Sequence, residues 1–354
     1  MALTLGIETS CDETSVAVVA DGRRILANVI HSQVDVHKAF GGVVPELAAR
    51  DHIRRLPQLL DMALDEAKVA PQDLDLVAVT RGPGLVGCLL VGVGVGEGLA
   101  AAWSKPITGV NHLWGHIYAA LLARPDLEPP LIALVVSGAH SDLVRMPSHG
   151  RFELIGRTRD DAAGEAFDKA ARMLGLGYPG GPALDRLARK GDPKRQRLPR
   201  PSLPGFEYSF SGVKTALLYR LRGLGDPDEQ TRGDLAAAFE ESIVESLLEK
   251  LGAAIEAEGC REVVVCGGVA SNTLLRRRAQ ELVDGRARLT MPPLELCTDN
   301  AAMIAAAGFF TSPLARGGPP TAGLATLGEK GAALSEVGGG PKLGSTEVDP
   351  SLSW

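Results

Sequence analysis

The sequence predicts an α/β protein built from two similar lobes with a ligand-binding cleft between them. A group of short strands followed by a long helix occurs at residues 3–68 and again at residues 131–174. Each group continues with alternating strands and helices, the pattern of a largely parallel sheet covered by helices. The chain has 354 residues, 45% of them hydrophobic, which is enough to bury two cores.

In the first lobe, short apolar runs bounded by turn residues predict strands at residues 3–7, 15–20 and 24–30. Apolar residues then recur at helical spacing from about residue 44 to residue 68, which predicts an amphipathic helix. Further strands of this lobe are expected at residues 76–80 and 106–110.

The most apolar stretch, residues 85–103, lies between these last two strands. Its length would suit a membrane span, but Glu97 interrupts it and five glycines thin its side chains. We therefore expect a closely packed helix within the fold and no contact with a membrane.

The second lobe is expected to repeat this plan. Its first strands are predicted at residues 131–137, 142–146 and 152–155, followed by a helix at residues 162–174. The remaining elements are helices at residues 235–258 and 272–283 and strands at residues 262–266 and 288–291.

These elements divide the chain into three parts. Residues 1–125 form the N-terminal lobe, which a helix near residues 300–311 completes, and residues 126–299 form the C-terminal lobe. Residues 312–354 are rich in glycine and proline and lack periodicity, so we expect a tail with weak or absent structure.

Charge and cysteine content narrow the classes of function. The formal net charge is −6, so any contact with RNA must use a local basic patch, such as residues 194–200 or 276–278. The five cysteines are scattered and contain no Cys-x-x-Cys pair, which is typical of reduced thiols in the cytoplasm. No signal peptide is recognised after Met1.

A pair of histidines is the first candidate site. His112 and His116 are four residues apart, so a helix would place both imidazoles on one face. With the carboxylate of Asp299 they would suit one divalent metal ion. Alternatively, the histidines lie on a surface and Asp299 caps the next helix. Leu113 replaces the general-base glutamate of a His-Glu-x-x-His zinc protease, which argues against that chemistry.

Turns at residues 9–14, 137–139 and 267–268, the last two with glycines, favour a phosphate or nucleotide ligand. Small residues there let backbone N–H groups approach phosphate oxygens, although each turn alone also suits an ordinary connection between strands. The first two turns lie at matching points of the two lobes, which favours a ligand between them.

Acidic residues follow the second of these turns. Asp161 is expected to cap the helix that it precedes, and residues 178–182 are expected to form a rigid turn. Asp168 and Asp185 would then suit recognition of a ribose or another hydroxyl group.

The duplicated lobe resembles the superfamily of actin, sugar kinases and the Hsp70 ATPase. A series of ordered motifs from about residue 3 to about residue 310 gives a narrower resemblance, to the bacterial TsaD family of tRNA N6-adenosine threonylcarbamoyltransferases. These motifs are Gly-Ile-Glu-Thr-Ser-Cys-Asp-Glu-Thr at residues 6–14, Gly-Gly-Val-Val-Pro-Glu at 41–46, Gly-Pro-Gly-Leu-Val at 82–86, His-Leu-Trp-Gly-His at 112–116, Asp-Asp-Ala-Ala-Gly-Glu-Ala-Phe-Asp-Lys at 160–169, Tyr-Pro-Gly-Gly-Pro at 178–182, Phe-Ser-Gly-Val-Lys at 210–214, Gly-Gly-Val-Ala-Ser-Asn at 267–272 and Cys-Thr-Asp-Asn at 297–300.

The resemblance implies that a threonylcarbamoyl group passes from threonylcarbamoyl-AMP to N6 of adenosine 37, in tRNAs that read codons beginning with A, with release of AMP. His112, His116 and Asp299 would hold one divalent ion, with Fe²⁺ preferred and Zn²⁺ as the second choice. The implied partners are tRNA, a catalytically inactive paralogue (TsaB-like) and a small ATPase (TsaE-like). The implied adenylate pocket consists of Val135, Val136, Ser137, Gly138, Ala139, Asp168, Gly181, Asp185 and Asn272.

The resemblance does not identify the base that removes the N6 proton. Asp12 and Glu13, in the first of these turns at residues 9–14, are the candidates for this catalytic role. Ala139 replaces a glycine that is usual in the family, and its Cβ is expected to restrict how closely the backbone approaches a phosphate.

Two other functions compete with this one. An ATP-dependent kinase of the same superfamily would use the fold and the glycine turns, but it would leave the two histidines and Asp299 unexplained. A scaffold without catalytic activity would also need no such set of ligands, and the metal content of the purified protein would distinguish it from the transferase.

Overall fold

The computed structural model describes residues 1–318 and 345–354, and the chain divides into two compact units. Unit 1 comprises Met1–His37, Val43–Asp126 and the described part of Asp299–Trp354. Unit 2 comprises Lys38–Gly42 and Leu127–Thr298. The chain therefore leaves unit 1 after its first third and returns to it at Asp299.

Each unit contains one sheet of five strands, and the two sheets have the same topology. The first strand of each unit pairs antiparallel with the second, which pairs antiparallel with the third. The fourth strand pairs parallel with the first, and the fifth pairs parallel with the fourth. The predicted duplication is confirmed, whereas the expected cleft stays a prediction. In unit 1 the strands are β1 (Leu3–Glu8), β2 (Glu13–Ala20), β3 (Arg24–Ser32), β4 (Leu76–Gly82) and β5 (Ile107–Asn111); in unit 2 they are β6 (Leu131–Val136), β7 (Ser141–Ser148), β8 (Arg151–Arg157), β9 (Glu262–Cys266) and β10 (Arg288–Thr290).

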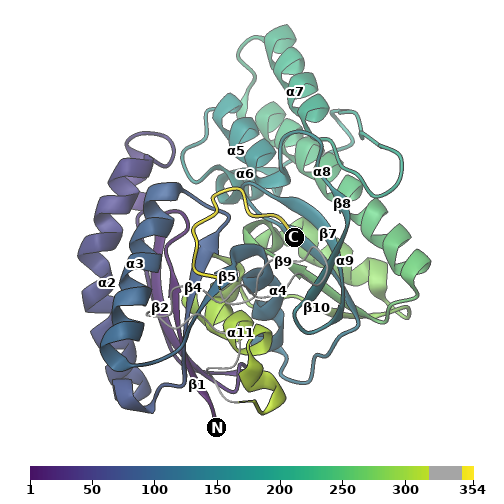
Figure 1. The fold of residues 1–354 in the computed structure, drawn as a ribbon. Coiled ribbons are helices and arrows are strands. Elements are labelled where there is room, and N and C mark those ends of the chain that lie inside the picture. Colours follow the sequence, from purple (N-terminus) through teal and green to yellow (C-terminus); the bar gives the residue numbers. More distant parts are fainter. Residues whose placement is uncertain (319–344) are drawn as a thin grey trace. The chain divides into compact units, whose positions relative to one another are not determined.

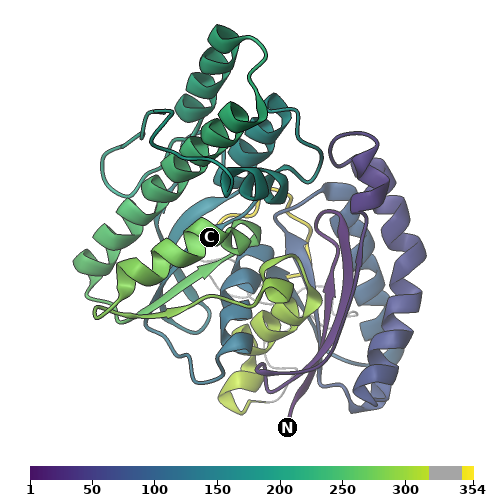
Figure 2. The ribbon, with the colours of Figure 1, turned by 180° about the vertical axis from the view of Figure 1, so that it is seen from behind.

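Helices cover both faces of the sheet in unit 1, where α2 and α3 lie on one side and α4 and α11 on the other (Figure 1). Figure 2 shows unit 1 from behind, with the purple strands β2 and β3 beside α2. Because successive side chains of a strand point to opposite faces, Leu5 and Ile7 pack toward α2 and α3, whereas Gly6 and Glu8 point toward α11 and α4. The helical segments of unit 1 are α1 (Val34–Lys38), α2 (Pro45–Ala67), η1 (Pro71–Asp73), α3 (Val86–Trp103), α4 (His112–Ala123), α11 (Ala301–Thr311) and η3 (Pro313–Arg316).

In unit 2, the apolar faces of α5, α6 and α8 enclose a large core against the sheet. Helix α8 begins six residues before its expected start, because the Asp228 side chain caps it by accepting a hydrogen bond from the Thr231 backbone N–H at 2.7 Å. The helical segments of unit 2 are α5 (Ala163–Met173), α6 (Gly180–Ala188), α7 (Ser211–Leu224), α8 (Glu229–Glu258), η2 (Gly268–Ser271), α9 (Thr273–Val283) and α10 (Leu294–Cys297).

Two local expectations for unit 2 are wrong. The predicted rigid turn at residues 178–182 ends at Pro179, and α6 begins at Gly180. Asp161 does not cap α5, because Ala162 is the N-cap residue and the Asp161 carboxylate binds the amino groups of Lys169 and Lys214.

Helix α3 is the one helix among the described residues that is long and apolar enough to cross a membrane by composition. It connects the parallel strands β4 and β5 and packs on β4 and α2. It is therefore a crossover helix between two parallel strands of an α/β unit. This agrees with the expectation of a helix within the fold.

The expectation that residues 312–354 lack structure is wrong for two described segments. The segment η3 follows α11, and residues 345–354 contact unit 1. The Asp349 backbone N–H donates to the Arg81 carbonyl at 2.9 Å, and the Asn111 side chain donates to the Ser353 carbonyl at 3.1 Å. Residues 319–344 lie outside the described residues.

Candidate metal centre and ligand-binding loops

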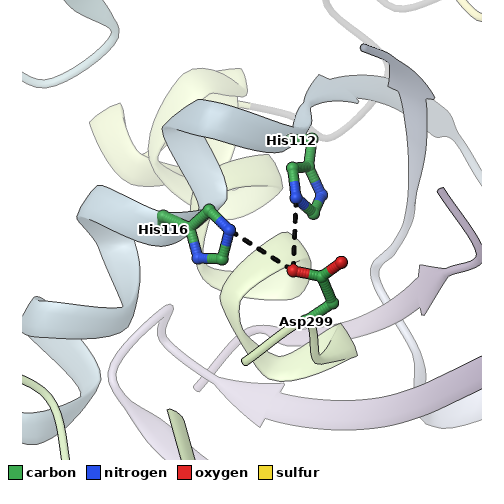
Figure 3. Close-up of side chains that lie close together, drawn as sticks. All are labelled: His112, His116 and Asp299. Carbon is green, nitrogen blue, oxygen red and sulfur yellow. Dashed lines mark ion pairs between the residues drawn. The ribbon is translucent and has the colours of Figure 1, made fainter. Parts of the chain in front are cut away.

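Helix α4 carries the two histidines on one face, as the sequence predicted (Figure 3). The helix begins at His112, because the Asn111 side chain caps it by accepting a hydrogen bond from the Leu113 backbone N–H at 2.9 Å. The Asp299 Oδ1 atom lies 3.3 Å from His112 Nε2 and 3.4 Å from His116 Nε2. Three side chains from two distant parts of the sequence thus converge in unit 1.

This set of side chains fits a single divalent ion. The potential ligand atoms of the three residues lie within 4.8 Å of one another. Tetrahedral coordination with bonds of about 2.0–2.2 Å places ligand atoms about 3.3–3.6 Å apart, close to the two separations between Asp299 and the histidines. The His116 ring is 1% exposed, and neither ring nitrogen has a hydrogen-bond partner within the described structure. A cation would satisfy a buried polar group that is otherwise costly to bury.

Helix α11 brings Asp299 to this position. Asn300, and not Asp299, is the N-cap of α11 and accepts a hydrogen bond from the Met303 backbone N–H at 3.1 Å, so the alternative role of Asp299 as the cap is wrong. The helix packs closely on β1, where a Cβ on Gly6 would lie 2.1 Å from the Ala301 carbonyl oxygen. This close approach holds the start of α11, and hence Asp299, beside α4.

A carboxylate that sequence reasoning missed lies behind His112. Glu8, the last residue of β1, is fully buried, and its Oε2 atom lies 3.0 Å from His112 Nδ1. Burial disfavours the charge of this carboxylate, but the His112 imidazole outweighs that effect and lowers the pKa of Glu8. Burial likewise opposes the charge of His112, whereas Asp299 and Glu8 together raise its pKa well above the usual value.

Of the candidate catalytic residues, Asp12 lies in the turn between β1 and β2, and Glu13 is the first residue of β2. Burial, reinforced by the charges of Asp299 and Asp12, raises the pKa of Glu13 to about 9. Glu13 therefore holds a proton at neutral pH in the protein alone. The Ser32 hydroxyl donates a hydrogen bond to it at 3.2 Å.

A buried polar network holds this turn in place, and no sequence pattern indicated it. His52 of α2 contacts the Cys11 carbonyl oxygen through Nε2 at 2.9 Å and the Thr14 hydroxyl through Nδ1 at 2.7 Å. Gln33 contacts His52 and the ring of His37. Thr14, Gln33, His37 and His52 are all 0% exposed, so the network fixes both ends of the turn.

In unit 2, strand β6 ends in the turn that was predicted to bind phosphate. Val135 and Val136 are buried in the strand, whereas Gly138 and Ala139 are exposed. The Ser137 backbone N–H donates to the His140 carbonyl at 2.8 Å and closes the turn. The side chain of Ala139 is exposed, and the expected restriction of phosphate approach by its Cβ stays a prediction.

Two glycines bring neighbouring elements against this turn. A Cβ on Gly164, at the start of α5, would lie 2.5 Å from the Ser137 carbonyl oxygen. Gly267 follows β9 with a φ angle of 91°, and a Cβ there would lie 2.4 Å from the Val136 carbonyl oxygen. The N-terminus of α5 and the start of η2 therefore both lie beside residues 136–138.

The remaining candidate pocket residues form two pairs. The Asp168 carboxylate accepts a hydrogen bond from the Gly181 backbone N–H at 3.1 Å. The Asp185 Oδ1 atom accepts hydrogen bonds from the Thr273 hydroxyl at 2.6 Å and from the Asn272 amide at 3.4 Å. Since η2 packs against α5 and β6, the structure places these pairs in the same part of unit 2 as the turn.

Asn272 has all of its side-chain atoms engaged within the protein. Its Oδ1 atom caps α9 by accepting from the Leu275 backbone N–H at 2.9 Å, and its Nδ2 atom donates to Glu240 at 2.6 Å. Burial raises the pKa of Glu240 to about 8, against the lowering effect of the Asn272 hydrogen bond. Asn272 and Asp185 thus fix the loop that carries the glycine turn.

Comparisons with known proteins agree with this geometry. The family model described as "TsaD: tRNA N6-adenosine threonylcarbamoyltransferase" matches residues 24–306. A protein of that name from Symbiobacterium thermophilum is 54% identical over 310 residues, which cover 87% of this chain and 91% of the relative. Another from Anaeromyxobacter dehalogenans is 50% identical over 321 residues, which cover 90% of this chain and 96% of the relative.

Solved structures share the fold at much lower identity. The crystal structure of HypF from T. kodakarensis matches 87% of this chain and 47% of its own, with a TM-score of 0.60 and 13% identity. Full-length HypF in a phosphate- and nucleotide-bound form matches 87% of this chain and 55% of its own, with a TM-score of 0.59 and 14% identity. These likenesses show that the chain shares its α/β fold with HypF.

Proposed function

The chain belongs to the TsaD family of tRNA N6-adenosine threonylcarbamoyltransferases, and we propose that it modifies adenosine 37 of tRNAs that read codons beginning with A, with threonylcarbamoyl-AMP as the donor and AMP as the leaving group. The observation that carries the proposal within the structure is the meeting of His112, His116 and Asp299 at ligand distances in unit 1. An ATP-dependent kinase is not favoured, because the close relatives are named as transferases and a kinase leaves this set of ligands without a role.

We propose Fe²⁺ as the native ion, with Zn²⁺ as the second choice. Two imidazoles and one carboxylate with open positions are the ligand set of many non-haem Fe(II) sites, and the same ligands also bind Zn²⁺. When bound, such an ion supplies a Lewis acid that holds and polarises oxygen atoms of the donor. Metal analysis of protein purified without oxygen tests this choice, and an ion other than iron at one equivalent per chain would reject Fe²⁺.

The reaction itself needs positioning more than covalent catalysis, because threonylcarbamoyl-AMP is already an activated mixed anhydride. The adenosine N6 forms a bond to the carbamoyl carbon, the bond from that carbon to the phosphate oxygen breaks, and the N6 proton passes to a base. We propose Asp12 or Glu13 as this base, since Asp12 precedes β2 and Glu13 begins it, in the same unit as the three candidate metal ligands. We propose that the backbone N–H groups of Gly138 and Ala139 stabilise the phosphate of AMP, since the Ser137 N–H already donates to His140 and the Gly164 N–H of α5 to Ser137.

The test of the proposed function is mass analysis of tRNA nucleosides after incubation with threonylcarbamoyl-AMP and partner proteins. Wild-type protein should form N6-threonylcarbamoyladenosine, and His112→Ala should form little or none. A matched control is His149→Ala, because His149 belongs to unit 2 and its ring contacts the exposed Glu128 carboxylate at 2.9 Å. Equal product from wild type and His112→Ala would reject the metal centre as the site of reaction.

For tRNA binding we propose the basic surface of unit 2 around Glu241. Two adjoining grooves share Pro193 and Glu241; one contains Lys194, Arg197 and Arg200 and the other Arg189, Arg277 and Arg278. The Glu241 carboxylate lies 3.4 Å from Arg200 and 4.0 Å from Arg278, so one acid faces two guanidinium groups. Arg276, in contrast, donates inward to the carbonyl groups of Ala270 and Pro292.

Reversal of two of these charges tests the surface. Lys194→Glu combined with Arg197→Glu should weaken tRNA binding and reduce the dependence of log Kd on log salt by about one unit for each phosphate group that is no longer bound. Arg316→Glu, in unit 1, is the control for a general effect of charge. Unchanged affinity at low salt would exclude this surface.

We further propose that the inactive paralogue docks on α3 of unit 1 and that a small ATPase acts in the same assembly. Val86 and Leu90 are 51% and 56% exposed, and Gly94 and Gly98 continue their row at helical spacing with open space beside them. Such an apolar row suits a partner helix. Leu90→Glu should abolish co-elution with the paralogue, whereas co-elution at wild-type affinity would exclude the surface.

We infer that the protein works in the cytoplasm. The five cysteines are all free thiols in the structure, as expected in a reducing compartment that also contains the tRNA substrate. Fractionation of cells that express the tagged protein tests this location, and recovery with membranes would contradict it.

A further inference from the structure

Glu8 is a carboxylate where an apolar side chain would be expected. It ends β1, in which Leu3, Leu5 and Ile7 are buried, and it is itself 0% exposed. Burial of a charge is costly unless hydrogen bonds compensate it. The proposed transferase reaction assigns no role to this group, so its retention in the core needs a reason.

Three donors surround the two oxygen atoms of Glu8. The Ser10 backbone N–H donates to Oε1 at 2.5 Å, and the Thr80 hydroxyl donates to Oε2 at 2.6 Å. The His112 Nδ1 atom lies 3.0 Å from the same Oε2. An ionised carboxylate has no proton to donate, so Nδ1 must carry the hydrogen in this contact.

The position of that hydrogen decides what the other ring nitrogen can do. With the proton on Nδ1, a neutral imidazole has its lone pair on Nε2, and Nε2 faces Asp299 at 3.3 Å. Metal-binding histidines commonly donate their second ring N–H to a carboxylate, which fixes both the tautomer and the ring orientation. Glu8 lies on the Nδ1 side of the ring, so it is not itself one of the three grouped ligands.

We propose that Glu8 is a positioning residue that holds His112 as the Nδ1–H tautomer and thereby presents Nε2 to the metal ion. The inference rests on the proposed function, because it assumes that His112, His116 and Asp299 bind a metal. It adds a residue outside that set, delivered by the register of β1 with β4, which places the Thr80 hydroxyl at the same carboxylate oxygen.

Glu8→Gln separates this role from simple packing, since it keeps the size of the side chain. The glutamine amide has one oxygen and one NH₂ group, so it cannot accept hydrogen bonds at both positions as the carboxylate does. If its NH₂ group faces His112, the imidazole must lose the Nδ1 proton; if it faces Ser10, two donors oppose each other. Glu240→Gln is the matched control, because Glu240 is also a buried glutamate but belongs to unit 2.

The first measurement is the affinity for Zn²⁺, by competition with a chromophoric chelator, for the folded full chain. Glu8→Gln should bind about 10- to 100-fold more weakly than wild type, and Glu240→Gln should bind equally well. If Glu8→Gln does not fold, Thr80→Val replaces it, and loss of that one hydrogen bond should weaken binding about fivefold.

The second measurement is the ring-nitrogen spectrum of metal-free protein labelled with ¹⁵N-histidine. The chain has seven histidines, and the His112 signals are assigned by their absence in His112→Ala. Wild type should show the Nδ1–H tautomer at a pH where His112 is neutral, and Glu8→Gln should show a mixture or the Nε2–H form. A purely structural role for Glu8 would leave the tautomer unchanged.

These measurements can reject the role of Glu8 and the proposed metal centre independently of each other. If His112→Ala loses Zn²⁺ while Glu8→Gln retains wild-type affinity and tautomer, the role of Glu8 is overturned and the metal centre stands. If His112→Ala binds Zn²⁺ as tightly as wild type, the metal centre of the proposed function is wrong. In that case, the tautomer spectrum still decides whether Glu8 orients the ring.

Discussion

At the scale of single residues, close backbone approach determines where the metal ligands lie. Gly6 has no Cβ and so allows the first turn of α11 to sit on β1, two residues after Asp299. The site therefore depends on a glycine that touches no ligand.

We expect Gly6→Ala to destabilise unit 1 by about 1–3 kcal/mol, because a Cβ would lie 2.1 Å from a backbone oxygen that no side-chain rotation can move. Gly94→Ala is the matched control, since α3 has open space there and the better helix former should stabilise by about 0.5–1 kcal/mol. Urea unfolding followed by circular dichroism measures both. Equal stability of Gly6→Ala and wild type would show that α11 shifts freely on β1.

Glu240 predicts a dependence of stability on pH. Its pKa is about 8 in the folded protein against 4.5 for the free side chain, so the folded state holds a proton that the unfolded state releases. The stabilisation is full below pH 4.5 and is lost as the pH rises to about 8, with a slope of at most about 1.4 kcal/mol per pH unit. Glu240→Gln should flatten the pH dependence of the urea midpoint in this window, and an unchanged profile would contradict the assignment.

Some residues of the candidate site can be recognised from the sequence, and others only from the structure. The spacing of His112 and His116 and the chemistry of Asp299 were readable from the sequence, because metal ligands are few in kind. Glu8 was not, because its role comes from the pairing of β1 with β4 and from the place where α4 begins. His52 likewise became interpretable only when α2 was seen to lie against the turn after β1.

At the scale of elements, alternation and helical spacing predicted the strands and most helices. Helices α6 and α7 were missed because their first turns contain Gly180, Gly181, Pro182 and Gly212, which are typical of turns. Residues 345–354 were missed for another reason: most of their hydrogen bonds to the rest of unit 1 use backbone atoms of the segment, and such contacts require no apolar pattern.

Deletion of residues 345–354 should lower the stability of unit 1 by about 1–3 kcal/mol. The segment contributes Val348, packed against the core, and several hydrogen bonds to unit 1. A fall in the urea midpoint of the truncated protein would confirm this, with deletion of residues 351–354 alone as a milder comparison. A truncated chain as stable as the full one would show that the segment binds only weakly.

At the scale of the whole molecule, the two groups of candidate residues belong to different units. The three candidate metal ligands lie in unit 1 and the loops proposed to bind the adenylate lie in unit 2, each within its own sheet and helices. The duplicated topology was predictable because the order of strands and helices repeats along the chain.

This division predicts that a bound metal protects only one unit. Zn²⁺ at 100 times its Kd should stabilise unit 1 by about 2.7 kcal/mol. Hydrogen exchange should slow in peptides from β1, α4 and α11 and stay unchanged in β6, α5 and α9. His116→Ala should remove the effect, and equal slowing in both units would contradict a site confined to unit 1.

The chain terminus beside α4 has a practical consequence for handling the protein. An affinity tag fused after Trp354 would begin two residues beyond Ser353, whose carbonyl group accepts a hydrogen bond from the cap of the histidine-bearing helix. A tag ahead of Met1, which is 79% exposed, avoids that neighbourhood. A tag at the C-terminal end should therefore disturb the start of α4 more than a tag at the N-terminal end.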